Sequence, residues 1–142
     1  MKIKLIILAL ICFAALSAGA CTNTNKQNSI SFTSDDFAQS KNQTPSITGV
    51  KIGNTITITL PSNATTGFQW ALTAISDTSV LKQDGKSQYV LPESTLVGAG
   101  GQEIWTFKAL NRGTSTIYME YSQAWNGGTK GAWILAATVT VK

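Results

Sequence analysis

Two alternating stretches on either side of a short polar segment constrain the fold of this chain most strongly. Residues 54–60 alternate Thr with Ile or Leu, and residues 68–73 place Phe, Trp and Leu at every second position. A period of two is typical of a half-buried strand. The segment between them is small, polar and turn-forming, and its Gly67 can adopt a positive φ without strain. The sequence therefore predicts two strands that hold a short, preorganised loop with Thr65 and Thr66 at its tip.

The same period recurs along most of the remaining chain. Further strands are expected within residues 46–52, 87–91, 103–110, 114–121 and 132–141. In the first of these, Thr48, Val50 and Ile52 are expected to share one face. No sustained helical period follows the N-terminal 29 residues, so the pattern predicts an all-β sandwich, although a small barrel fits the alternation almost as well.

Shorter segments complete this prediction. Residues 29–37 predict a short edge strand followed by a turn, and residues 38–45 predict a loop. Val80 and Leu81 are expected to pack locally. Three tryptophans lie on alternating apolar faces and are expected in the core: Trp70, Trp105 and Trp133.

The N-terminus has the features of a secretion signal. Lys2 and Lys4 precede an apolar stretch at residues 5–16, which is too short to span a bilayer comfortably. Small residues then lead directly to Cys21. This order predicts a signal peptide over residues 1–20 of the lipoprotein type, with Cys21 lipidated. Residues 21–29 are polar and predict a flexible tether, which leaves residues 30–142 as one domain.

An ordinary secretory signal is the alternative for this segment. Ala18 stands where a lipoprotein signal normally has Leu, and residues 18–20 also fit a secretory cleavage site. A lone thiol next to the cleavage point favours lipidation, because a free exposed thiol is a liability in an oxidising compartment. We expect a protein secreted across the cytoplasmic membrane and anchored by lipid to the cell envelope, on the periplasmic side or at the cell surface.

The composition argues against several classes of function. The chain has no His, and removing Lys2 and Lys4 with the signal leaves nine basic against seven acidic side chains. Cys12 is removed as well, so no disulfide is expected in the mature chain. Without His, and with Cys21 at the tether, nucleophile–base pairs and ordinary metal sites lack their usual residues. We expect no enzyme, metal, cofactor or nucleic-acid partner.

Residues 63–70 resemble the first binding loop of the chagasin-like inhibitors of cysteine peptidases. The family motif reads Asn-Pro-Thr-Thr-Gly-aromatic with a Trp two residues later, and this chain departs from it only at Ala64. Residues 98–101 match the second family loop, Gly-x-Gly-Gly. In the third loop Trp125 is kept after Tyr121, but Gln123 and Ala124 replace the family Arg and Pro. The three loops match in order and spacing, and the resemblance covers roughly residues 30–142.

The resemblance implies an immunoglobulin-like sandwich with three binding loops at one end. It also implies a monomeric, reversible inhibitor that blocks the active-site cleft of a papain-like cysteine peptidase. Thr65 and Thr66 would lie at the catalytic centre, Gly100 and Gly101 would let the backbone approach the cleft wall, and Trp125 would anchor the other side. The residues implied as contacts are Asn63, Thr65, Thr66, Gly67, Phe68, Gly98, Gly100, Gly101, Gln123 and Trp125.

Each loop also has an interpretation without a peptidase. The glycines of residues 98–101 are also typical of a bulge and turn. Trp125 lies in a polar, glycine-rich segment, which favours exposure and suits a binding module for a glycan or protein of the cell envelope. That module is the alternative function. The adjacent Thr65 and Thr66 favour the peptidase inhibitor over the binding module, because a sugar site does not need them.

Overall fold

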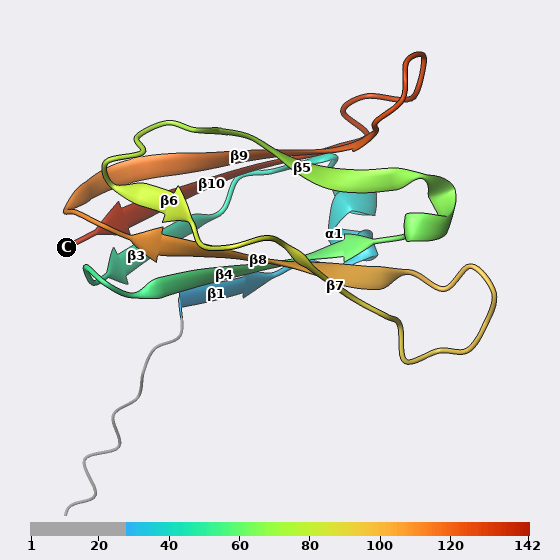
Figure 1. Ribbon diagram of the computed structural model, residues 1–142, viewed down its shortest axis with the longest axis horizontal. Helices are drawn as coiled ribbons and strands as arrows, with labels where there is room; N and C mark the ends of the chain where they lie inside the picture. Colours follow the sequence, from blue (N-terminus) through green and yellow to red (C-terminus); the bar gives the residue numbers. More distant parts are fainter. Residues whose placement is uncertain (1–27) are drawn as a thin grey trace, which may run out of the picture.

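The computed structural model describes residues 28–142, which form two β-sheets packed face to face (Figure 1). The expected signal peptide, Cys21 and most of the expected tether lie outside the described residues. The predicted tether, residues 21–29, ends two residues too late, because the first strand begins at Asn28 rather than at residue 30.

One sheet has the strand order β1-β4-β8-β6, with β7 also paired to β8. Its strands are β1 (Asn28–Ser31), β4 (Thr55–Ser62), β6 (Leu81–Gln83), β7 (Gln88–Val90) and β8 (Gly101–Ala109). β1 runs parallel to β4, and the other pairs are antiparallel.

The second sheet has the order β2-β10-β9-β5, with β3 also paired to β10. Its strands are β2 (Asn42–Gln43), β3 (Ser46–Val50), β5 (Phe68–Ile75), β9 (Gly113–Gln123) and β10 (Trp133–Val141). β2 and β3 run parallel to β10, whereas β10–β9 and β9–β5 are antiparallel. The all-β sandwich predicted from the alternation is confirmed.

The core lies between the sheets and follows the predicted faces. Every second residue of β4, β8, β9 and β10 is buried, since successive side chains of a strand point to opposite faces. The fully buried set includes Ile56, Ile58, Leu60, Phe107, Ile117, Met119, Leu135 and Val139. Trp70 and Trp105 are buried as predicted, whereas Trp133 is only half buried. Val80 and Leu81 belong to this common core rather than to a local cluster.

The turn predicted after β1 is wrong, because the chain forms a helix there, α1 (Ser34–Gln39). Thr33 donates to Asp36 Oδ2 from its backbone N at 2.7 Å and from its hydroxyl at 2.8 Å, which closes the first helical turn. Phe37 is 1% exposed, and its ring stacks on that of Trp133 at 4.9 Å between centroids. Six residues are too few to show a helical period in the sequence. β2 likewise lies within the predicted loop at residues 38–45.

The face predicted for β3 is also wrong. Ile47 and Val50 are buried, whereas Thr48 and Ile52 are exposed. Gly49 lies between the buried pair with φ of +76°, and the pairing with β10 shifts register at the same place. Such a bulge shifts the alternation by one residue.

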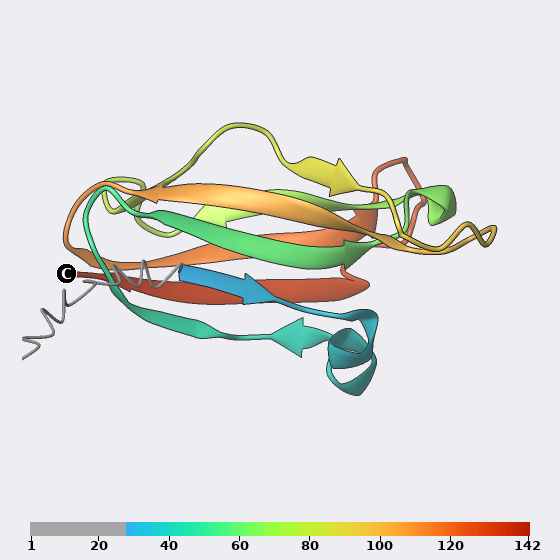
Figure 2. The same ribbon diagram turned by 90° about the horizontal axis from the view of Figure 1, so that it is seen from below.

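Three connections lie at one end of the sandwich, which we call the loop end (Figures 1 and 2). Loop 1 is residues 63–67, with the short helix η1 (Ala64–Thr66). Loop 2 is residues 91–100, between β7 and β8, and loop 3 is residues 124–132, between β9 and β10. Helix α1 lies at this end as well. The beginning of β1 and the C-terminus lie toward the opposite end.

The packing of α1 predicts a large effect of Phe37→Ala. Removing this buried ring should lower the free energy of unfolding by about 3–5 kcal/mol, the usual range for a buried Phe. Gln39→Ala on the same helix is the control, because that side chain is exposed. Urea unfolding measures both. Equal losses in the two variants would mean that α1 is not held by its aromatic residue.

Candidate functional site

Loop 1 is closed on itself by Asn63. Its Oδ1 accepts from the backbone N of Thr65 at 3.2 Å and from the Thr65 hydroxyl at 2.7 Å. The Thr66 hydroxyl donates to the Asn63 carbonyl at 2.7 Å. Thr65 and Thr66 are exposed at the tip, as expected, but both hydroxyls donate to Asn63. The loop is therefore preorganised by its own side chains.

Asn63 also connects loop 1 to loop 2. Its Nδ2 donates to the Gly98 carbonyl at 2.9 Å, and Gly98 has φ of +84°. Gly100 lies against the same loop: a Cβ there would be 3.5 Å from the Ser62 carbonyl, which is ordinary van der Waals contact. Among residues 28–142 no group requires a glycine at position 100, so the close approach of this position to a partner stays a prediction.

Gly101 has a different role. It is buried, and a Cβ there would lie 2.2 Å from the Val90 carbonyl and 2.7 Å from the Tyr89 hydroxyl. The close approach at this glycine is therefore made by β7 of the same chain. We assign Gly101 to the fold and Gly100 to the exposed loop.

Loop 3 is held by Gln123, whose side chain points inward. Its Nε2 donates to the Thr66 carbonyl of loop 1 at 3.2 Å, and its Oε1 accepts from the Thr129 backbone N at 3.0 Å. The Lys130 ammonium donates a hydrogen bond to the Gln123 carbonyl. Gln123, which replaces the family Arg, thus connects loops 1 and 3 through hydrogen bonds.

Trp125 covers Gly67 of loop 1. A Cβ on Gly67 would lie 2.4 Å from the Trp125 ring, and Gly67 has φ of +75°, as its sequence position predicted. Both observations exclude a side chain at this position. The Trp125 ring remains 51% exposed, which agrees with the exposure expected from its polar surroundings.

An aromatic cluster lies against loop 1. The Tyr121 hydroxyl accepts from the Asn63 backbone N at 2.9 Å. The Tyr121 ring lies 4.7 Å from that of Trp133 and 5.3 Å from that of Phe68, between centroids. Phe68, predicted as a contact, is half buried and packs on this cluster. Loop 1 is therefore held directly against the core.

A family model of known proteins matches residues 49–141, which is more than half of the chain, with the description "Chagasin family peptidase inhibitor". The chain belongs to the chagasin family. Chagasin of Trypanosoma cruzi is 34% identical over 80 residues, which cover 55% of this chain and 73% of that protein. The family suggested by the three loops is confirmed.

Three solved structures share the fold. The crystal structure of the cysteine protease inhibitor EhICP2 of Entamoeba histolytica has a TM-score of 0.60 at 20% identity, over 81% of this chain and 95% of that one. PbICP-C, solved in complex with falcipain-2, has a TM-score of 0.55 at 22% identity, over 81% and 99%. The solution structure of Amebosin has a TM-score of 0.54 at 21% identity, over 82% and 98%.

The structure brings all ten predicted contact residues to the loop end, but it divides their roles. Thr65, Thr66, Gly100 and Trp125 are exposed, whereas Gln123 and Gly101 are used within the chain. Tyr121 anchors loop 1, and it was not among the residues predicted for this site. Its place on the inner face of β9, two residues before Gln123, was the available signal.

Within residues 28–142, no three His, Cys, Asp or Glu side chains gather to hold a metal ion. Over the same residues, no helix is long and apolar enough to cross a membrane.

Glu120 holds the base of loop 3, and its ionisation is linked to that loop. The Ser122 hydroxyl and then the Gly131 backbone N donate to its carboxylate and, aided by the Lys130 charge, lower the pKa of Glu120 below its ordinary value of 4.5. Burial raises the pKa of Glu120, by less than the two hydrogen bonds lower it but by more than the Lys130 charge does. The folded protein therefore favours the ionised carboxylate.

This shift predicts how Glu120→Gln depends on pH. A lowered pKa in the folded state stabilises the protein above the ordinary value of 4.5, and that contribution is lost as the pH falls through the lowered value. The wild type should be more stable than Glu120→Gln at pH 7, and the difference should shrink below about pH 4.5. Urea unfolding between pH 3 and pH 7 measures it, with the exposed Glu93→Gln as control. A constant difference across this range would contradict the linkage.

Proposed function

We propose that this domain is a reversible inhibitor of papain-like cysteine peptidases and that its three loops together block the active-site cleft. The observation that carries the proposal is the mutual bracing of the loops. Asn63 bonds loop 1 to loop 2, and Gln123 and Trp125 hold loop 3 against loop 1. The family membership and the complex of PbICP-C with falcipain-2 support the same class of target.

Bracing matters because ordering loops on binding costs free energy. Each immobilised flexible side chain costs about 0.5–1.5 kcal/mol, so a surface that is ordered beforehand binds more tightly for the same area. The loops carry internal hydrogen bonds at Asn63, Thr66 and Gln123. A braced loop is also a poor substrate, because a peptidase must bend the chain into its catalytic site to cleave it.

The exposed groups of the loop end define the contact surface. Loop 1 presents Ala64, Thr65 and Thr66, and loop 3 presents Trp125. Loop 2 adds an apolar tip, since Leu96 and Val97 are exposed large hydrophobic side chains. An apolar centre with a polar surround is typical of tight protein interfaces.

The retained aromatic predicts a large effect of Trp125→Ala on inhibition. This change should weaken inhibition of papain by about 2–4 kcal/mol, or roughly 30- to 1,000-fold, as for other aromatic anchors. Tyr118→Ala is the matched control, because Tyr118 is 41% exposed on β9, outside the loops. Inhibition constants for papain, with urea unfolding for both variants, provide the measurement.

Two outcomes would contradict the proposal. If papain cleaves the wild-type domain without being inhibited, the inhibitor function fails and an envelope-binding module becomes the better interpretation. If Trp125→Ala leaves the inhibition constant unchanged, loop 3 does not contribute to the interface.

We further propose that Cys21 is lipidated and anchors the domain to the cell envelope. Its position after small residues at the end of an apolar stretch supports this. β1 begins toward the end opposite the loops, so an anchor upstream of Asn28 would leave the loop end free (Figure 1).

Cys21→Ser tests the anchor. The wild type should fractionate with membranes, and the variant should be released into the soluble fraction. Ser17→Ala, in the same segment, is the control and should remain with the membranes. A wild type that is already fully soluble would show that the protein is secreted without lipid.

A further inference from the structure

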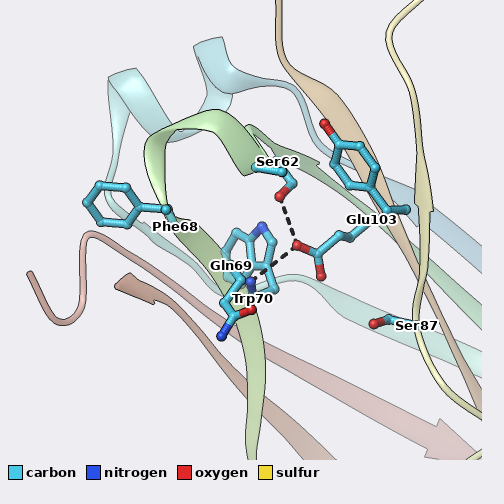
Figure 3. Close-up of a pocket in the computed structure, with 9 residues that line it drawn as sticks. Ser62, Phe68, Gln69, Trp70, Ser87 and Glu103 are labelled. Carbon is cyan, nitrogen blue, oxygen red and sulfur yellow. Dashed lines mark hydrogen bonds between the residues drawn. The ribbon is translucent and has the colours of Figure 1, made fainter. Parts of the chain in front are cut away.

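A cavity of about 360 Å³ opens beside loop 1, where β5 of one sheet faces β7 and β8 of the other (Figure 3). Ala64 and Gly67 of loop 1 line it, together with Gln69, Ser87 and Glu103. Its volume lies within the range of small-molecule sites, about 300–1,000 Å³. The three-loop mechanism makes no use of this cavity.

Glu103 is the unusual group in the cavity. It lies on the inner face of β8 with the core residues Trp105 and Phe107 and is only 8% exposed. Its Oε1 accepts from the Ser62 hydroxyl at 2.8 Å and from the Trp70 backbone N at 3.3 Å. These two bonds fix the carboxylate in place (Figure 3).

The second oxygen of Glu103, Oε2, accepts no hydrogen bond from any residue in the 28–142 range. It lies on the side of the carboxylate away from Ser62 (Figure 3). Among the described residues, Trp105 Nε1 is the only fully enclosed side-chain polar atom that lacks a partner. Oε2 also lacks a partner, so it is not fully enclosed, and Glu103 lines the cavity. A carboxylate oxygen in a mostly buried position is costly without a donor, which makes this atom a ready acceptor.

The other lining groups fit a cation. Among the described residues the cavity is lined by one carboxylate and by no basic side chain. Gln69 and Ser87 offer further acceptor oxygens, and the aromatic residues Trp70 and Tyr89 line the same space. Charge-assisted hydrogen bonds to a carboxylate are about twice as strong as neutral ones, and aromatic rings also attract cations.

We propose that this cavity binds an alkylammonium or guanidinium group, with Glu103 Oε2 as its principal acceptor. Two sources carry this chemistry. One is a free small cation. The other is a Lys or Arg side chain of a protein docked on loop 1, which could enter past Ala64 and Gly67; this second source alone rests on the proposed inhibitor function.

The experiment is a titration followed by NMR shifts of the Trp70, Ser87 and Glu103 amides. The probes are methylguanidinium and propylammonium at constant ionic strength, with tetramethylammonium as a cation that cannot donate a hydrogen bond. Saturable shifts are expected with the first two probes. Binding should weaken at least tenfold in Glu103→Gln, which keeps an Oε1 acceptor for Ser62 and Trp70, and should not change in Glu93→Gln, which removes the same charge from loop 2.

A second variant guards against a structural effect of Glu103→Gln. Ser87→Leu leaves the bonds of Glu103 intact and fills the cavity, so it should abolish binding while urea unfolding stays close to that of the wild type. The proposal is overturned if no probe gives a saturable shift, or if Glu103→Gln and Ser87→Leu both bind as the wild type does.

Inhibition of papain then distinguishes the two sources. If a peptidase side chain occupies the cavity, Glu103→Gln should raise the inhibition constant about tenfold, and methylguanidinium should compete with the peptidase. If the ligand is a free cation, Glu103→Gln should still weaken binding of the probes. The inhibition constant for papain should then be the same for the wild type and for Glu103→Gln. Because the titration needs no peptidase, its failure is separate from a failure of the inhibitor function.

Discussion

The contact between Tyr121 and Asn63 connects the core of this protein to its functional end. The Tyr121 ring is fixed among Phe68, Trp70 and Trp133, and its hydroxyl accepts from the Asn63 backbone N. Asn63 then orders loop 1 through its side chain and reaches loop 2 at Gly98. Loop 1 is therefore positioned by the aromatic cluster around Tyr121.

Loop 1 in turn positions the other two loops. Gln123 bonds to its carbonyl at Thr66, and Trp125 lies over Gly67. This arrangement explains how the third loop keeps its shape without the Arg and Pro implied by the family motif. An amide that bonds inward replaces a side chain expected to reach a partner, so the loop end gains internal order where it loses a charged contact.

The glycines at the loop end have different roles although they lie close together in the sequence: some are required by the fold, and one belongs to the predicted contact surface. Gly67 and Gly101 are required by neighbouring groups of the same chain, whereas a Cβ on Gly100 would make only ordinary contacts with Ser62 and Asn63. Glu103 is a similar case on the inner face of β8, where a carboxylate occupies a core position and opens one oxygen to a cavity. A polar group at such a position costs stability, which favours a role in binding.

The sequence by itself determined an all-β fold and the buried faces of β4, β5, β8, β9 and β10, because alternation is a local property of each strand. The order of the three loop motifs gave the family, and through the family the choice of a sandwich over a small barrel. The sequence pattern failed at α1, whose six residues are too few for a period, and at β3, where Gly49 shifts the alternation by one residue. Only the tertiary structure decided that Gln123 points inward, that Tyr121 carries loop 1 and that Glu103 faces a cavity. Each of these depends on a contact between segments at least 30 residues apart, which no local pattern encodes.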